Sequence, residues 1–98
     1  MTHTVVRYTI KPGLEDRNAE LVRAVYRELA ELEPTGFRYA TYHLEGGRDF
    51  VHVAERDAGG ENPLPGLPAF REFQAGIGER CESGPEVSVA ELVGRYGA

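Results

Sequence analysis

The middle of the 98-residue chain carries the stretch Phe37-Arg38-Tyr39-Ala40-Thr41-Tyr42-His43-Leu44-Glu45-Gly46-Gly47-Arg48-Asp49-Phe50-Val51-His52-Val53-Ala54. It contains two runs, 37–44 and 50–54, that are rich in aromatic and β-branched residues, a composition typical of β-strands. Two glycines, Gly46 and Gly47, lie between the runs, and paired glycines in that position indicate a hairpin turn because glycine readily adopts positive φ. We therefore predict an antiparallel hairpin at the centre of the chain.

A strand and a helix are predicted before this hairpin. Residues 5–10 are β-branched or aromatic at nearly every position, and Pro12 ends this run because proline donates no ladder hydrogen bond. From Leu14 to Leu32 the apolar residues recur at helical spacing, and Pro34 follows. The first half of the chain therefore reads as strand, helix, strand.

A helix and a strand are predicted after the hairpin. Residues 57–66 are rich in glycine and proline and predict a loop long enough to form a lid or an interface arm. Apolar residues at spacings of three and four predict a helix over 67–81, with Cys81 on its apolar stripe. Residues 87–93 predict a last strand, with a bulge near Ala90.

The predicted order is strand, helix, strand, strand, helix, strand, which is the ferredoxin-like βαββαβ arrangement. We expect one domain over residues 1–98, of α+β class, with a four-stranded antiparallel sheet and both helices on one face. A chain of this length buries a modest core, which favours completion of the core by a second copy.

Composition limits the partners. Eleven Lys and Arg against 16 Asp and Glu give a formal net charge of −5, and no basic patch is apparent, so neither nucleic acid nor an anionic membrane is an expected partner. No long apolar stretch or charged leader is visible, so neither a membrane span nor a signal peptide is predicted. A single cysteine, Cys81, cannot form an internal disulfide, and we expect a cytoplasmic location.

Alternation along the hairpin assigns its residues to two faces. With the glycines in the turn, His43 lies opposite Phe50 and Thr41 opposite His52. We expect the helices to cover the face that carries Ala40, Tyr42, Leu44, Val51 and Val53. The other face would be bare and would pack against a second copy; it carries Phe37, Tyr39, Thr41, His43, Phe50, His52 and Ala54. In the first strand we expect Val6, Tyr8 and Ile10 to face the helices, which places Arg7 on the bare face near His43 and His52.

The bare face supplies the candidate site residues. His52 and His43 are the candidate catalytic residues, because an imidazole can remove a phenolic or enolic proton, and a buried position beside Arg7 would keep His52 neutral. The candidate substrate-binding residues are Arg7, Tyr39, Thr41 and Phe50, the guanidinium for an anionic oxygen and the rings for stacking. The alternatives are a hydrogen-bonded histidine pair at a subunit interface, an ion pair of Arg7 across a dimer, and ordinary ring packing. Two imidazoles with no adjacent acid are too few for a metal site, and no cofactor motif is present.

The sequence resembles the dimeric α/β-barrel superfamily, and within it the antibiotic-biosynthesis-monooxygenase-like proteins. The resemblance rests on residues 6–13 followed directly by a helix, on the strand 50–55, and on the helix start at 68–73. It implies a homodimer in which two ferredoxin-like subunits pack sheet against sheet, and some members of the family oxidise aromatic polyketides without metal or flavin. The chain lacks the pocket tryptophan of haem-degrading members, and Leu67, Pro68 and Ala69 occupy the region of the family's frequent histidine in the second helix.

These observations together predict a cofactor-independent monooxygenase-like enzyme that acts on a small aromatic or enolisable molecule in a cavity of the dimer. The alternative is a non-catalytic dimer of the same fold that binds a small ligand or has a structural role. Fold alone does not decide between them.

Overall fold

A computed structural model describes residues 1–97, and its elements follow the predicted order, with the second helix in two parts. Their bounds are β1 (Thr2–Ile10), α1 (Glu15–Leu32), β2 (Phe37–His43), β3 (Asp49–Arg56), the short 3₁₀ turn η1 (Leu64–Gly66), α2 (Pro68–Ala75), α3 (Ile77–Arg80) and β4 (Cys81–Ala90). The turn η1 lies inside the stretch 57–66 that was predicted as a loop.

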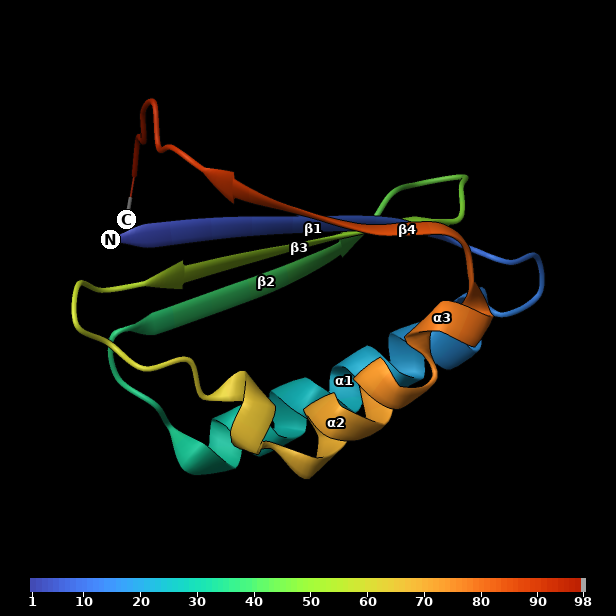
Figure 1. The fold of residues 1–98 in the computed structure, drawn as a ribbon, viewed down its shortest axis with the longest axis horizontal. Coiled ribbons are helices and arrows are strands. Elements are labelled where there is room, and N and C mark those ends of the chain that lie inside the picture. The colour runs from blue at the N-terminus through green and yellow to red at the C-terminus, as the bar shows by residue number, and fades with distance from the viewer. Residues whose placement is uncertain (98) are drawn as a thin grey trace.

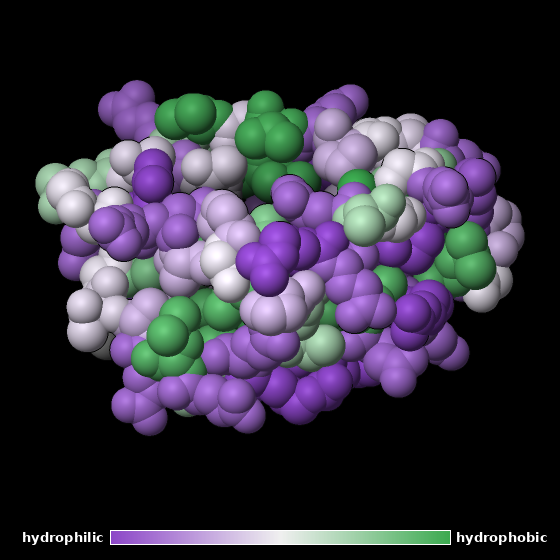
Figure 2. Space-filling view, turned by 60° about the horizontal axis from the view of Figure 1, so that its bottom comes forward, coloured by the Kyte–Doolittle hydropathy of each residue, from purple (hydrophilic) through white to green (hydrophobic). Residues whose placement is uncertain are grey.

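The strands form one antiparallel sheet in the order β2-β3-β1-β4. All the helices lie on one face of this sheet, and the opposite face has no helix over it (Figure 1). The predicted ferredoxin-like α+β arrangement is therefore confirmed. Viewed from the helix side, the surface is mostly hydrophilic, as expected for helices that turn their polar faces to water (Figure 2).

Helix α1 packs on the sheet through the predicted apolar stripe. Leu21, Val22 and Val25 are buried, and Asn18 is buried with them. Glu15 and Asp16 lie in the first turn, where a negative charge interacts favourably with the helix dipole. The helix ends where Glu33 adopts a left-handed conformation and its backbone N–H donates to the carbonyl of Leu29.

The predicted hairpin register is confirmed. His43 lies opposite Phe50, and Thr41 lies opposite His52. Gly46 has a φ of +72°, which the tight turn requires, and the N–H of Leu44 donates to the carbonyl of Asp49 at 3.0 Å to close the turn.

The predicted faces of the hairpin are reversed. Strand β1 pairs with β3 so that Tyr8 lies opposite Phe50 and Val6 opposite His52, and directly opposed residues share a face. Tyr8 faces the helices as predicted, so Phe50 and His52 face them too, and these two residues are only 2% and 4% exposed. The prediction that the bare face carries Phe37, Tyr39, Thr41, His43, Phe50, His52 and Ala54 is therefore wrong. The physical reason is that buried hydroxyl groups satisfy the imidazole of His52, which removes the cost of burying it.

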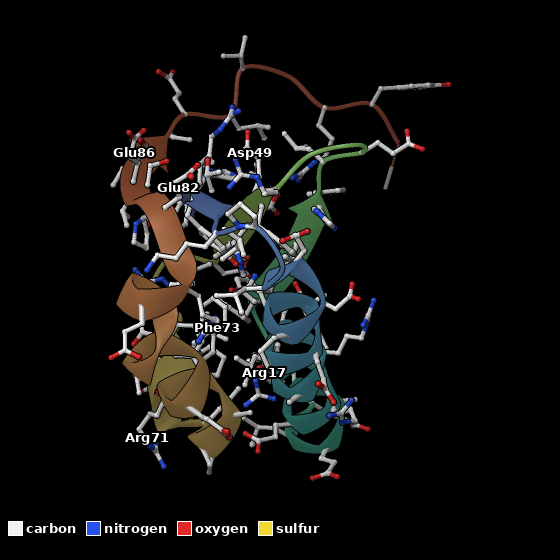
Figure 3. The ribbon with its side chains drawn as sticks, turned by 90° about the vertical axis from the view of Figure 1, so that its right-hand side faces the viewer. Arg17, Asp49, Arg71, Phe73, Glu82 and Glu86 are labelled. Carbon is white, nitrogen blue, oxygen red and sulfur yellow. The ribbon has the colours of Figure 1, made fainter. Side chains whose placement is uncertain are left out.

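The bare face instead carries Ala40, Tyr42, Val51 and Val53 of the hairpin together with ion pairs. Arg7 pairs with Asp49 at 3.0 Å, and at the same end of the molecule Arg48 pairs with Glu82 at 3.1 Å. Figure 3 shows Asp49, Glu82 and Glu86 together at this end, on the far side of the sheet from Phe73. The expected position of Arg7 near His43 and His52 is therefore wrong, because Arg7 and His52 are on opposite faces.

The second helix is shorter and less continuous than predicted. It divides at Gly76 into α2 and α3, and a Cβ atom at Gly76 would lie 2.7 Å from Nη1 of Arg80. Strand β4 begins directly after α3, so Cys81 pairs with Ile10 in the sheet and does not belong to the helix. Cys81 is buried, as its apolar position suggested.

The irregularity in β4 also lies elsewhere than predicted. The register between β1 and β4 shifts around Thr9, opposite residues 83–86, and not near Ala90. Gly84 lies in this irregular segment with a φ of +84°, and a Cβ atom there would be 2.9 Å from the carbonyl oxygen of Arg7. The close approach of two strands therefore requires glycine at this position.

Residues 91–97 continue from β4 without regular structure and form what we call the C-terminal arm. Arg95 on the arm pairs with Glu55 of β3, which belongs to the bare face. Val93 is 97% exposed and Tyr96 is fully exposed, so the arm presents apolar side chains to solvent. None of the helices in the described part of the chain combines the length and the apolar character that a membrane crossing needs.

Candidate functional site

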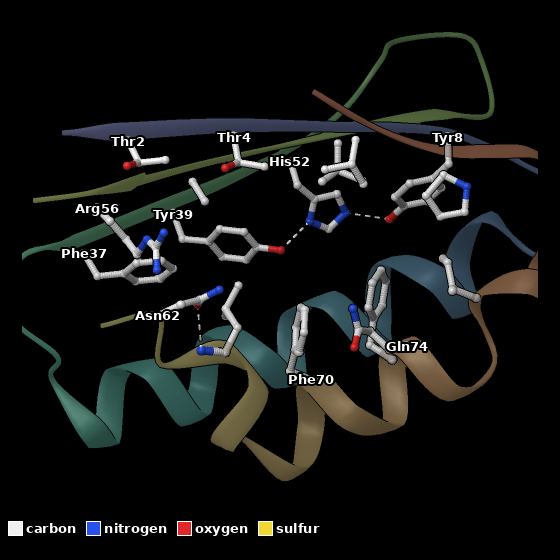
Figure 4. A pocket seen from close by; sticks show the side chains of 17 residues that line it. Thr2, Thr4, Tyr8, Phe37, Tyr39, His52, Arg56, Asn62, Phe70 and Gln74 are labelled. Atoms are coloured by element: carbon white, nitrogen blue, oxygen red, sulfur yellow. Dashed lines mark hydrogen bonds between the residues drawn. The ribbon is translucent and has the colours of Figure 1, made fainter. Parts of the chain in front are cut away.

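A cavity of about 480 Å³ lies between the sheet and helix α2. Its volume falls within the range of roughly 300–1,000 Å³ that small-molecule sites occupy. Figure 4 shows side chains from the sheet above and from α2 below converging on it. The residues that line it are Thr2, Thr4, Val6, Tyr8, Phe37, Tyr39, His52, Ala54, Arg56, Asn62, Leu64, Phe70, Phe73, Gln74, Ile77, Pro85 and Val87.

His52 lies at the centre of a buried hydrogen-bond network on the wall of this cavity. Its Nε2 is 2.6 Å from the hydroxyl oxygen of Tyr8. Its Nδ1 is 2.6 Å from the hydroxyl oxygen of Tyr39 and 3.0 Å from Oγ1 of Thr41. Both ring nitrogens therefore have partners, and two of these partners, Tyr8 and Tyr39, line the cavity with the imidazole (Figure 4).

The network continues from Tyr8 to a buried cation. Arg80 donates through Nε to Oδ1 of Asn18 at 3.1 Å, and Asn18 donates through Nδ2 to the hydroxyl oxygen of Tyr8 at 2.9 Å. Arg80 is itself held by a second bond to the carbonyl of Phe73 at 2.9 Å, and its guanidinium lies 5.2 Å from the centre of the Phe73 ring. Because arginine has no acceptor, it fixes which end of the Asn18 amide faces Tyr8.

This chain of donors sets the tautomer of His52. The Tyr8 oxygen accepts a hydrogen bond from Asn18, so its own O–H is free to donate to Nε2 of His52. A neutral imidazole then carries its proton on Nδ1 and donates toward Tyr39 and Thr41. The Tyr39 oxygen accepts the hydrogen bond from Nδ1–H, so the O–H of Tyr39 remains available to donate to a molecule in the cavity.

Burial keeps the three ionisable groups of the network neutral. It lowers the pKa of His52 to about 4 and raises the pKa values of Tyr8 and Tyr39 well above the usual phenol range. The neutral state of His52 agrees with the sequence prediction, but the cause is burial and not the proximity of Arg7. The imidazole is a weak proton acceptor at pH 7, so the network is better suited to donating a hydrogen bond than to removing a proton.

The six residues predicted for the site fall into three groups. His52 and Tyr39 line the cavity, and Thr41 is hydrogen-bonded to His52 without lining the cavity itself. Phe50 and His43 stack on each other with ring centres 4.3 Å apart, and neither lines the cavity; His43 is also hydrogen-bonded to the carbonyl oxygen of Gly47 in the hairpin turn. Arg7 lies on the bare face.

Sequence reasoning missed three members of the network, namely Tyr8, Asn18 and Arg80. Asn18 had a visible signal, because it is a polar residue within the apolar stripe of α1, between Leu14 and Leu21. Arg80 had a similar signal, because it is a charged residue directly before Cys81, at the end of the apolar stripe predicted over residues 67–81. Tyr8 was placed on the correct face, but nothing in the sequence shows that its hydroxyl meets His52, because the β1–β3 pairing joins distant parts of the chain.

The cavity wall is rich in aromatic rings and hydrogen-bonding groups. Within residues 1–97, no group of three or more His, Cys, Asp or Glu side chains is placed to hold a metal. Both nitrogens of His52 are already engaged by hydroxyl groups, so the imidazole has no lone pair directed at the cavity. The polar and stacking surface of the cavity is made of aromatic rings, hydroxyls, amides and the guanidinium of Arg56.

The fold and the cavity together define a class, that of ferredoxin-like subunits with a ligand-sized space between the sheet and the helices. Solved structures of this fold cover almost the whole chain. One is the Rv0793 protein of Mycobacterium tuberculosis, with 19% identity, 98% of each chain covered and a TM-score of 0.74. A conserved protein from Methanosarcina mazei Go1 has 20% identity, 91% of this chain and 89% of that chain covered, and a TM-score of 0.71.

A third structure, described as an antibiotic biosynthesis monooxygenase, has 19% identity, 96% of this chain and all of that chain covered, and a TM-score of 0.75. The resemblance to antibiotic-biosynthesis-monooxygenase-like proteins is thus confirmed as a likeness of fold. No family model matches the chain, and no curated protein matches it.

Proposed function

We propose that the protein is a cofactor-independent monooxygenase-like enzyme that acts on a small aromatic or enolisable molecule in the cavity between the sheet and α2. The observation that carries this proposal is the chain Arg80–Asn18–Tyr8–His52–Tyr39, which is oriented from end to end and leaves one hydroxyl proton for the ligand. The likeness of fold to an antibiotic biosynthesis monooxygenase agrees with it.

In this proposal Tyr39 is the catalytic residue and His52 is a positioning residue. The Tyr39 hydroxyl donates to the oxygen of a phenol or enol and stabilises the anion that forms there, as a preorganised donor does in an oxyanion site. His52 holds the Tyr39 oxygen in place through Nδ1. The ligand proton leaves to water at the open end of the cavity, because His52 is too weak a base to keep it.

The anion supplies the electrons for the reaction with dioxygen. Its carbon forms a bond to one oxygen atom and a proton completes a hydroperoxide; loss of the remaining C–H proton then breaks the O–O bond and releases water. For an activated methylene group the balance is R₂CH₂ + O₂ → R₂C=O + H₂O. The substrate is oxidised and dioxygen is reduced, so the step needs no further reductant.

Oxygen uptake with a panel of hydroxylated polycyclic aromatics tests the proposal. Tyr39→Phe removes the donor but keeps the ring, and should lower kcat by roughly 10²–10³-fold. His52→Ala should lower it similarly, and His43→Ala is the matched control because His43 lies outside the cavity. Full activity of Tyr39→Phe would refute the role of its hydroxyl.

The second candidate function is non-catalytic binding of the same class of ligand. It is favoured by the neutrality of the network, since no group in it is a strong base at pH 7. Ligands that bind without consuming oxygen, across the whole panel, would support this alternative over the enzyme.

We also propose that the bare face of the sheet packs against a second copy of the chain. Tyr42 on this face is 57% exposed, Val51 and Val53 lie beside it without a covering helix, and the apolar C-terminal arm extends from the same side. Light scattering at micromolar concentration should therefore report a dimer. Tyr42→Arg should yield a folded monomer, and a monomeric wild type would contradict the proposal.

A further inference from the structure

The wall of the cavity carries little formal charge. Of its lining residues, Tyr8, Tyr39, His52 and Arg56 are ionisable, and burial keeps the first three neutral near pH 7. No aspartate or glutamate lines the cavity. The guanidinium of Arg56 is therefore the single formal charge on its wall.

Arg56 is flanked in sequence by acidic residues that do not reach it. Glu55 and Asp57 both pair with Arg38, at 2.8 and 3.3 Å, because alternation along β3 turns residue 56 to the face opposite Glu55. Arg56 is half-buried and forms no ion pair with any of residues 1–97. Arg48, in the turn that precedes β3, is also half-buried, but it forms an ion pair with Glu82.

A half-buried guanidinium without a carboxylate partner keeps its fork of N–H donors available for an anionic group of a ligand. Two neutral groups lie at the same end of the cavity, Thr2 directly opposite Arg56 on β1, and Asn62 below Tyr39 (Figure 4). Asn62 uses its Oδ1 to accept the N–H of Leu64 at 3.0 Å, so its amide N–H groups remain available as donors. This end of the cavity thus offers donors and no anionic acceptor.

The space next to Arg56 is shaped for a ring. Phe37 lies directly opposite Arg56 on β2, and Tyr39 follows on the same face, with the two rings 5.9 Å apart. Phe70 lines the cavity from α2 (Figure 4). His52 precedes Arg56 by four residues on β3, a distance of about 13 Å along the strand, so one ligand can extend from the guanidinium toward the hydroxyl of Tyr39.

We propose that Arg56 is the anion-binding residue of this cavity and that the ligand is a planar aromatic molecule carrying an anionic oxygen group, such as a carboxylate or a phenolate. This inference rests on the proposed use of the cavity as a ligand site and names the class of ligand. The anionic group lies against Arg56, and the rest of the ring system extends between Phe37 and Phe70 toward Tyr39.

A matched pair of probes tests the inference. Naphthalene-2-carboxylate and naphthalene-2-carboxamide have the same shape and differ in charge, so calorimetry with both reports the contribution of the anion. We expect the carboxylate to bind roughly 10–100-fold more tightly than the amide to the wild type, with a preference that weakens as salt is added. Shifts of the His52 and Tyr39 NMR signals should accompany binding, which places the probe in the cavity.

Variants then assign the preference to a residue. Arg56→Gln should bring the two probes to within about twofold, and Arg56→Lys should restore part of the preference. Arg23→Gln is the control for net charge, because Arg23 is exposed on α1 and does not line the cavity. A preference that survives Arg56→Gln, equal binding of both probes to the wild type, or binding of neither would overturn the inference.

This experiment is independent of catalysis, because neither probe needs to be oxidised. If the carboxylate is preferred through Arg56 while no compound of the aromatic panel consumes oxygen, the anion site stands and the oxygenase proposal fails. If oxygen is consumed but the charge of the ligand is without effect, the oxygenase proposal stands and the role of Arg56 fails.

Discussion

Acidification should destabilise the protein through His52 in a defined pH window. The ring is 4% exposed, its neighbours are the hydroxyls of Tyr8, Tyr39 and Thr41 and the ring of Phe73, and no carboxylate of the described residues bonds to it. Burial lowers its pKa from 6.5 to about 4. Between these values the unfolded chain binds a proton that the folded chain does not, so stability falls as the pH is lowered from 6.5 to 4.

The magnitude follows from the size of that shift. About 2.5 pH units at about 1.4 kcal/mol per unit give a full loss of about 3.5 kcal/mol in the free energy of unfolding, of which about 3 kcal/mol is reached by pH 4, where the folded ring is half protonated. This is a large part of the roughly 5–15 kcal/mol that stabilises a typical domain. The carboxyl groups of Asp49 and Glu55 have pKa values lowered by hydrogen bonds to Thr9 and Arg38, respectively, so their contribution is lost at lower pH than that of His52.

Urea unfolding followed by circular dichroism at pH 7, 6, 5 and 4 measures this loss. His52→Gln keeps a polar side chain but does not titrate, so its stability should change by about 3 kcal/mol less than that of the wild type over the same range. An NMR titration of the His52 ring should show no protonation above about pH 5. A midpoint near 6.5, or parallel losses in the two proteins, would refute the assignment of a buried neutral imidazole.

Two further substitutions test the packing around the site. Asn18→Leu removes the acceptor of Arg80 and the donor to Tyr8, and should lower the free energy of unfolding by about 2–4 kcal/mol, measured by urea denaturation; an unchanged midpoint would show that the network contributes nothing. Gly84→Ala should destabilise more than Gly13→Ala, because both have positive φ but only the first places a Cβ atom against the backbone of β1, at 2.9 Å. Equal midpoints for the two variants would contradict the close approach of β1 and β4.

The local features of the fold could be predicted from sequence, while the orientation of the hairpin could not. The turn at Gly46 fixed which residues of β2 and β3 oppose each other, because register in a hairpin depends on nearby residues. The face that meets the helices depends on the pairing of β1 with β3, between residues more than 40 positions apart. Apolar side chains occur on both faces of the hairpin, so alternation alone does not select one.

The polar network explains why the wrong face was selected. In sequence, a histidine that lies opposite a threonine across a hairpin looks the same whether that face is buried or half-exposed. Only the tertiary structure shows that tyrosine hydroxyls satisfy both nitrogens of His52. The apolar spacing over residues 67–81 predicts one helix, which Gly76 and Gly78 weaken but do not interrupt. It divides at Gly76, where the side chain of Arg80 occupies the space that a Cβ atom would need.

The cavity and the bare face lie on opposite sides of the sheet, and this separation determines how many ligands a dimer would bind. The sheet residues that line the cavity face the helices, so two copies joined through their bare faces would place their cavities on the outer sides of the dimer, separated by two sheets. Binding would be stoichiometric at one molecule per chain, with a Hill coefficient of one in the absence of coupling through the sheets. A mixed dimer of wild-type and Tyr39→Phe subunits would then keep half the activity of the wild type, since the cavity of each subunit faces away from the other subunit.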